Sequence, residues 1–347
     1  MRLLIVTQSV DREDPNLGAF YYWFEALAQR VESLCILARH VGTPDLPVNT
    51  DVYSFDTKGG GRVGRIWRFW TLFSHHFARS DTVLFHQIPE FVLAASPFLF
   101  AQSRSAALWY AHGSVPRRLR WAERMVDYVF TSSPDGFRLP SKKVFHLGQA
   151  INTEFFFPSA SIRLPHSPNG LSLVTIGRLA PVKNYEVIIN ACAILRRNWQ
   201  RAWTLSIIGG PLTASDRAYA ARLKELVREK GLAGEIHFYG EHRYSEIPAI
   251  LRDHDIFLNA SRTGSLDKAV LEAMACGLTV LTSNQAYRSV LPAPYFLQHL
   301  SPEFLAARIQ ALADEPRPNI ALREIVVREH ALEQTVGRLV DILRETL

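Results

Sequence analysis

Short apolar runs alternate with amphipathic stretches along most of the chain. Residues 3–7 form such a run, with β-branched members and polar flanks, which predicts a buried strand. Similar runs recur at 33–38, 51–55, 82–86, 106–111 and 128–132. Most of the segments between them have apolar residues at helical spacing, as in 19–31. Strands that alternate with helices predict a parallel sheet covered on both faces.

Residues 151–170 interrupt this alternation. The segment contains three prolines and ends on Asn-Gly, which predicts a linker or domain boundary. After it the alternation restarts, with strands expected at 171–177, 203–209, 235–240, 255–260 and 278–283 and helices at 184–197, 215–230, 245–252 and 266–276. We therefore expect two doubly wound α/β domains that leave a cleft between them. Their expected bounds are 1–155 and 156–330, and a C-terminal helix at 331–347 is expected to pack back on the first domain.

Length and composition agree with a two-domain globular chain. The 347 residues exceed the roughly 250–300 at which a single core stops growing. Cys35, Cys192 and Cys276 form no CxxC pair, which argues against a disulfide framework or a zinc site and favours a reducing cytoplasm. The first residues do not resemble a signal peptide, and no apolar run reaches the roughly 20 residues of a membrane span. We expect a cytoplasmic protein that does not span a membrane.

The net charge of +6 is unevenly distributed. The segment 58–80 has no acidic residue and contains Lys58, Arg62, Arg65, Arg68 and Arg79. Within it, 62–79 is a predicted helix whose apolar stripe is expected to face the core: Val63, Ile66, Trp67, Trp70, Phe73 and Phe77. The alternative is a membrane-surface element, with arginines for anionic lipid and aromatic residues for the interface. The arginines of this helix, with Arg117, Arg118, Arg120 and Arg124, predict an anionic membrane as a partner. Nucleic acid is not expected, since no recognition motif accompanies the bases.

Three loops that follow predicted strands have the residues of an anion site. In IGRLAPVKN, Arg178 and Lys183 lie at a strand–helix junction, a location suited to a pyrophosphate. In IIGGPL, Gly209 would let the backbone approach a ligand closely. In SRTGSLDKAVLEAMACG, one carboxylate, Glu272, lies in an apolar helix and needs a partner such as a ribose diol. Taken one at a time, each loop is also compatible with a plain turn or a solvated surface.

Taken together and in this order, GRLAPVKN, IIGGP and LDKAVLEAMACGLTVLTSN resemble the donor domain of glycosyltransferase family 4, whose members are retaining enzymes of the GT-B fold. YYWFEALAQRV, AALWYAHG and HLGQAINTEFFFP are similar to segments of that family's first domain. The resemblance covers nearly the whole chain. It implies that a nucleoside diphosphate sugar binds mainly to the second domain and an acceptor mainly to the first, with no obligatory metal or other cofactor.

The resemblance also implies roles for individual residues. Arg178 and Lys183 would neutralise the diphosphate, and His112 would contact the transferred sugar; these three are the expected catalytic residues. The donor would also be bound by Gly18, Gly209, Glu272 and the backbone N–H groups of Lys268 and Ala269. His86 also follows a predicted strand and is a second candidate for the cleft. A histidine in such a place is often only hydrogen-bonded within the fold, an alternative that applies to His112 too.

The chain departs from the family pattern at Gly264. The family has two glutamates eight positions apart, and eight residues before Glu272 lies this glycine. Ser265 and Asp267 are the nearest polar replacements for the missing carboxylate and are possible sugar contacts. The alternative that we favour for Asp267 is an ordinary first-turn acid that satisfies helix N–H groups. The side chain of Lys268 either contacts phosphate or is solvated.

The sequence therefore predicts a hexosyltransferase-type enzyme that acts on a UDP- or GDP-linked sugar and a glycan or lipid-linked acceptor, in cell-surface polysaccharide or glycoconjugate biosynthesis, at the inner face of the membrane. Two alternatives remain open. One is a sugar-nucleotide epimerase, a chemistry that also occurs on the GT-B fold. The other is a non-catalytic sugar-nucleotide-binding subunit, which the change at Gly264 keeps open.

Overall fold

The computed structural model describes residues 1–57, 61–101, 104–159 and 170–345. The chain divides into two compact units, the first made of Met1–Asn152 with His330–Leu347 and the second of Thr153–Glu329. The division after Asn152 comes three residues before the expected boundary at 155/156. Residues 160–169 of the expected linker, Lys58 of the basic segment and the last two residues lie outside the described residues.

The first unit is built on a seven-stranded parallel sheet with the strand order β3-β2-β1-β4-β5-β6-β7. Its strands are β1 Arg2–Val10, β2 Ser33–Val41, β3 Thr50–Ser54, β4 Thr82–His86, β5 Ser105–Trp109, β6 Tyr128–Thr131 and β7 Val144–His146. The six predicted strands are all present. The edge strand β7 was not predicted, because three residues are too few to show an alternating pattern.

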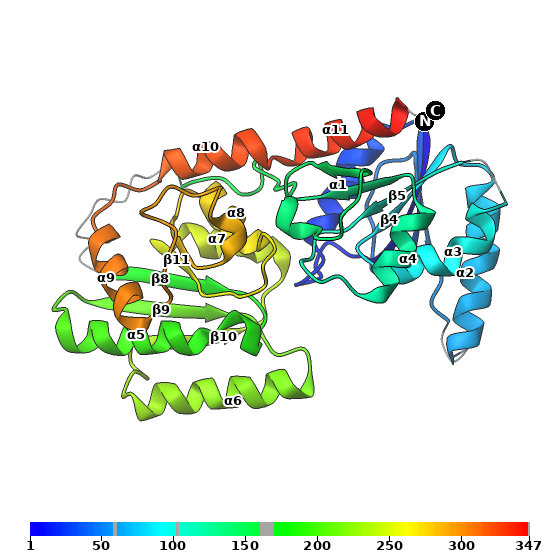
Figure 1. The fold of residues 1–347 in the computed structure, drawn as a ribbon. Helices are drawn as coiled ribbons and strands as arrows, with labels where there is room; N and C mark the ends of the chain where they lie inside the picture. Colours follow the sequence, from blue (N-terminus) through cyan, green and yellow to red (C-terminus); the bar gives the residue numbers. More distant parts are fainter. Residues whose placement is uncertain (58–60, 102–103, 160–169, 346–347) are drawn as a thin grey trace. The chain divides into compact units, whose positions relative to one another are not determined.

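Helices cover both faces of this sheet (Figure 1), as the alternation predicted. One face packs against α1 Ala19–Ala28 and α11 Leu332–Arg344, through residues such as Leu3 and Ile5. The other face packs against α2 Gly61–Phe77, α3 Pro89–Leu99 and α4 Arg117–Met125, through residues such as Leu4 and Val6. The C-terminal helix therefore belongs to the core of the first unit.

The predicted apolar stripe of α2 is wrong in its first half. Phe73 and Phe77 are fully buried, and Phe69 is buried with them, but Val63 is 69% exposed and Trp67 is 64% exposed. Ile66 is exposed as well, whereas Trp70 is partly buried and donates from its indole N–H to the carbonyl of Ala94 at 2.8 Å. The core side of α2 thus begins only at Phe69, and its first two turns present apolar side chains to solvent.

The second unit contains a five-stranded parallel sheet with the order β10-β9-β8-β11-β12. The strands are β8 Leu171–Ile176, β9 Trp203–Ile208, β10 Ile236–Gly240, β11 Ile256–Asn259 and β12 Thr279–Thr282. The helices are α5 Tyr185–Asn198, α6 Ala214–Glu229, α7 Ile247–Arg252, α8 Lys268–Ala275, α9 Pro302–Leu312 and α10 Ile320–Glu329. Because all five strands are parallel, the loops that follow them meet at one edge of the sheet.

Candidate functional site

Lys183 and Asp267 form a largely buried ion pair at this edge of the second sheet. Lys183 ends the short 3₁₀ turn Pro181–Lys183 after β8, and Asp267 directly precedes α8. The ammonium of Lys183 lies 2.8 Å from Oδ1 of Asp267, and the two side chains are only 20% and 11% exposed. The fold thus brings two of the predicted site residues into direct contact, although they lie 84 positions apart in the sequence.

Asp267 does not have the capping role that we favoured for it. It occupies the N-cap position of α8, but its side chain makes no cap hydrogen bond. Its carboxylate instead accepts hydrogen bonds from the side chains of Lys183, Asn259 (3.0 Å) and Thr263 (3.2 Å). Burial raises the pKa of Asp267, but the charge and hydrogen bonds of its partners outweigh burial and hold that pKa below its usual value. The carboxylate is therefore ionised at neutral pH.

Glu272 has a partner that the sequence did not indicate. Its side chain is 4% exposed, and its Oε1 accepts a hydrogen bond of 2.8 Å from the hydroxyl of Tyr244. Tyr244 begins the 3₁₀ turn that follows β10. Burial raises the pKa of Glu272, while the Tyr244 hydrogen bond and the charge of Lys268 oppose that rise. The ribose contact expected of Glu272 stays a prediction.

Lys268 lies one helical turn before Glu272 on α8. Its Nζ atom is buried, so the solvated alternative for this side chain is wrong. Burial lowers the pKa of Lys268 to about 8, although the charge of Glu272 acts in the opposite direction. Ala269 follows in the first turn of the same helix, where backbone N–H groups point toward the N-terminal end.

Arg178 lies in the same β8–α5 loop as Lys183 but has a different neighbour. Its Nε is 3.8 Å from Oδ2 of Asp216, and its side chain is 41% exposed. Asp216 is engaged in the capping box of α6 with Thr213. Arg178 is thus the more accessible of the two predicted diphosphate cations, and Lys183 the more firmly held.

Gly209 is required by its close approach to a neighbouring loop. Its φ is +127°, and a Cβ at this position would lie 2.1 Å from the carbonyl oxygen of Gly177. Gly177 follows β8 and Gly209 follows β9, so the two loop backbones touch where they leave the sheet. Any side chain at position 209 would push these loops apart. Its predicted contact with a nucleotide is not tested by this geometry.

The turn before α8 explains why residue 264 is a glycine. Its φ is +67°, in the left-handed region that residues other than glycine rarely adopt. The turn is held by Asn284, whose side-chain amide donates to the carbonyl of Ser265 at 2.7 Å. A glutamate at position 264 would be strained in this backbone conformation. Ser265 takes part in the turn through its backbone, and its sugar contact stays a prediction.

The remaining predicted residues lie in the first unit. His112 is exposed in the loop after β5, where its Nδ1 accepts a hydrogen bond from the backbone of Ser114. Gly18 precedes α1 with φ −56°, a value open to any residue, so this glycine is not needed for backbone conformation. His86, by contrast, is 4% exposed and packs at 4.0 Å against the ring of Phe20. His86 is therefore a core residue.

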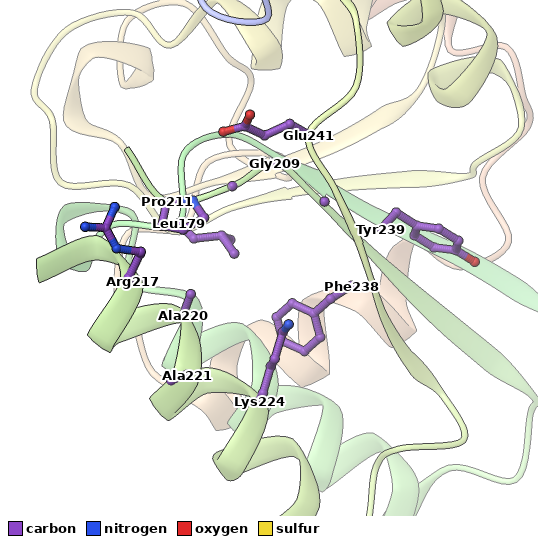
Figure 2. Close-up of a pocket in the computed structure, with 12 residues that line it drawn as sticks. Leu179, Gly209, Pro211, Arg217, Ala220, Ala221, Lys224, Phe238, Tyr239 and Glu241 are labelled. Carbon is purple, nitrogen blue, oxygen red and sulfur yellow. The ribbon is translucent and has the colours of Figure 1, made fainter. Parts of the chain in front are cut away.

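In the second unit, a pocket of about 660 Å³ lies beside the loops that follow β8 and β9, between α6 and the end of β10. Figure 2 shows Gly209 and Pro211 on one side of it and Phe238 on the other, with the side chain of Lys224 reaching up from α6. The Nζ of Lys224 lies 5.8 Å from the centre of the Phe238 ring. One wall of this pocket is the loop of Gly209, which the sequence had marked as a ligand loop. The rest was not predicted, because it comes from α6 and β10, whose residues have no motif.

The part of the chain that the structure describes contains no group of three or more His, Cys, Asp or Glu side chains arranged to hold a metal ion. Among the helices of that same part, none has the length and apolarity needed to cross a bilayer.

Solved structures with the same architecture define the class of fold. The structure of Anabaena HepE in complex with UDP and glucose superimposes with a TM-score of 0.77 over 99% of both chains, at 14% identity. Together with the two parallel-sheet units, this likeness confirms the GT-B fold.

The second unit matches a known family model. Residues 161–313, a little under half of the chain, match the model described as glycosyl transferases group 1. This match confirms the resemblance found in the sequence. Mannosylfructose-phosphate synthase of Agrobacterium fabrum is 27% identical over 173 residues, 46% of this chain and 38% of that protein. D-inositol 3-phosphate glycosyltransferase of Thermobispora bispora is 25% identical over 244 residues, 65% and 56% of the two chains. The chain thus spans about a third to just over half of the length of the first curated relatives that it matches.

Proposed function

We propose that this chain is a retaining glycosyltransferase that moves a sugar from a nucleoside diphosphate sugar to a hydroxyl of a glycan or glycolipid acceptor. One observation carries the proposal: Arg178, Lys183, the N-terminal end of α8 and Glu272 lie on loops and helices at a single edge of the second sheet. Two cations and a helix N-terminus suit a diphosphate. A buried carboxylate one turn into the same helix suits the hydroxyls of a ribose.

In this proposal, catalysis rests on holding the diphosphate as it departs. The bond between the sugar C1 and the phosphate oxygen breaks, and the acceptor oxygen bonds to C1 on the same face. The proton of the acceptor hydroxyl passes to an oxygen of the leaving phosphate. Arg178, Lys183 and the N–H groups of α8 stabilise the negative charge that develops, so the reaction needs no metal or other cofactor.

The donor is a UDP- or GDP-linked sugar in this proposal. The related HepE structure holds UDP and glucose, which supports a uridine nucleotide. The pocket beside Gly209 and Phe238 adjoins the loops assigned to the diphosphate and is the nearest concave surface for the nucleobase. Several of its walls are backbone or small side chains, which accept either base.

The acceptor binds in the first unit in this proposal. Two residues of this unit also contact the donor: His112 contacts the transferred sugar, and Gly18 lies close to the diphosphate. The exposed first turns of α2 and the arginines of α4 support the proposal that this unit binds an anionic membrane at the inner face of the cell envelope. A lipid-linked or surface-polysaccharide acceptor agrees with such a location. Helix α2 contains three arginines in its N-terminal half, two histidines in its last turn and no acid: Gly61–Phe77 reads GRVGRIWRFWTLFSHHF.

The experiment is a thermal-shift screen of UDP- and GDP-sugars, followed by turnover assays with any donor that binds. A ligand that binds only the folded state raises the melting temperature by mass action. Arg178→Ala and Lys183→Ala should each lower kcat/KM by about 100-fold. Arg222→Ala is the matched control, because that arginine pairs with Glu229 on the exposed side of α6.

Three outcomes contradict the proposal in different ways. If no UDP- or GDP-sugar shifts the melting temperature, the donor assignment fails. If a donor binds but is neither transferred nor hydrolysed across a broad acceptor panel, the chain is a binding subunit, as the glycine at 264 would allow. If the donor sugar is converted without an acceptor and without release of nucleoside diphosphate, the chain is an epimerase.

A further inference from the structure

The ion pair between Lys183 and Asp267 raises a question that the proposed function leaves open. Lys183 is assigned to the diphosphate, yet an ionised carboxylate lies 2.8 Å from its ammonium. A carboxylate so close to the ammonium should also repel a diphosphate bound to that ammonium, because the two groups carry charge of the same sign. The carboxylate therefore either hinders donor binding or makes a contribution large enough to outweigh the repulsion.

The surroundings of Asp267 favour a contribution. The carboxylate is held by Asn259 and Thr263 in addition to Lys183. Its backbone carbonyl accepts a hydrogen bond of 2.6 Å from the hydroxyl of Tyr287, which fixes the start of α8 from the other side. Asn259 is itself oriented by Thr282, whose hydroxyl donates to its Oδ1 at 2.9 Å. These hydrogen bonds hold the carboxylate of Asp267 in one position, and Lys183 pairs with it there.

A lysine ammonium has three N–H groups, and the bond to Oδ1 of Asp267 uses one of them. A lysine side chain in solvent samples many rotamers, and a ligand that binds it must restrict them. The ion pair with Asp267 restricts the rotamers of Lys183 before the ligand binds, so the ligand does not have to restrict them. The other N–H groups of the ammonium are then presented at the N-terminal end of α8, where the proposed diphosphate binds.

We infer that Asp267 is a positioning residue that acts through Lys183: it holds the ammonium in the conformation that receives the diphosphate, and it does not replace the missing sugar-binding carboxylate. Its carboxylate accepts hydrogen bonds from Lys183, Asn259 and Thr263, which orient it toward the ammonium. The inference rests on the proposed function, because it needs a diphosphate at Lys183.

The test compares the binding of UDP and of GDP by isothermal titration calorimetry at pH 7.5. Asp267→Asn keeps the shape of the side chain and removes its charge. If positioning dominates, the Kd rises by about tenfold; if the carboxylate mainly repels the ligand, the Kd falls. Glu229→Gln is the control, since it removes a carboxylate that pairs with Arg222 on the exposed side of α6, outside the pocket and away from Lys183. Its Kd should stay within about twofold of that of the wild type.

A double-mutant cycle separates positioning from a general structural effect. In the background of Lys183→Met, Asp267→Asn should change the Kd by less than about twofold, because its route of action has been removed. A loss that persists in full in this background would overturn the inference, as would a Kd for Asp267→Asn equal to or below that of the wild type.

Two further measurements keep the outcome clear. The melting temperature of each variant without ligand shows whether it folds. If Asp267→Asn does not fold, Asp267→Glu keeps the charge but moves the ammonium, and wild-type affinity in that variant would contradict the inference. If neither UDP nor GDP binds the wild-type chain, the proposed function fails and this inference fails with it. If they bind and Asp267→Asn has no effect, only the inference fails.

Discussion

At the scale of single residues, Lys183 and Lys268 are two cations of the candidate site whose surroundings differ. The ammonium of Lys183 is paired with the carboxylate of Asp267 at 2.8 Å. Lys268 is buried on α8 beside Glu272, and burial lowers its pKa to about 8. The charge of Lys268 is therefore sensitive to pH in a range where that of an ordinary lysine is not.

This difference predicts how nucleotide binding depends on pH. Lys268 carries its charge below about pH 8 and loses it above that value. If it attracts the diphosphate, the Kd for UDP or GDP should rise by about tenfold between pH 7 and pH 9, as the protonated fraction falls. Titration calorimetry across this range measures the effect.

Lys268→Met is the matched variant for this prediction. It should bind more weakly at pH 7 and show a nearly flat profile from pH 7 to pH 9, because no group of this pKa remains on α8. The same rise in Kd in Lys268→Met as in the wild type would assign the pH dependence to another group.

At the scale of elements, α2 is the helix whose behaviour differs most from its sequence pattern. Its second half packs in the core of the first unit through Phe69, Phe73 and Phe77. Its first half exposes Val63, Ile66 and Trp67 among arginines. Helix α4, which packs on the same face of the sheet, exposes Trp121, over which the guanidinium of Arg124 lies at 5.1 Å from the ring centre. Apolar and aromatic side chains among bases are typical of a surface that binds anionic lipid.

Trp67→Glu should therefore weaken binding to vesicles of phosphatidylcholine and phosphatidylglycerol by at least about tenfold, since it removes an interfacial aromatic and adds a repelled charge. Co-sedimentation with vesicles measures this binding. Gln334→Glu adds the same charge on α11, which covers the opposite face of the sheet. The proposed membrane contact is wrong if both variants bind like the wild type, or if wild-type binding does not weaken with added salt.

At the scale of the whole molecule, the chain returns to its first unit after completing the second. Helix α11 packs on α1 and buries Val336, Leu339, Val340 and Leu343. Backbone hydrogen bonds of Ile151 with His330 (2.7 Å) and Leu332 (2.8 Å) join the two segments where the chain passes between units. The first unit is therefore completed only by the last residues of the chain.

Leu339→Asp tests how independent the units are. A carboxylate at this fully buried position should destabilise the first unit severely, because burying an unpaired charge is costly. Nucleotide binding should stay within about twofold of the wild type, since the proposed diphosphate and ribose contacts, apart from that of Gly18, lie in the second unit. Calorimetric melting and UDP or GDP titration measure the two effects.

Gln334→Asp is the control, because residue 334 is exposed on the same helix. It should leave melting unchanged. Loss of nucleotide binding in Leu339→Asp would show that the donor site needs an intact first unit.

Much of the fold could be predicted from the sequence because strand and helix patterns are local. The predicted strands of both sheets are present, with ends that differ by a few residues. The loops that contain Arg178, Lys183 and Gly209, and the helix that contains Glu272, were found because parallel strands place the segments that follow them at one edge. The strand β7 was missed, since three residues at a sheet edge have no periodicity to detect.

The sequence by itself determined the two α/β units, the family resemblance and the residues worth testing, because these depend on short-range patterns and ordered motifs. Only the tertiary structure decided which side chains meet. Lys183 and Asp267 are 84 residues apart, and Tyr244 and Glu272 are 28 apart, so no local pattern links them. The exposed turns of α2 follow the same rule: periodicity shows which side chains share a face of a helix, but the surrounding core determines how much of that face is covered.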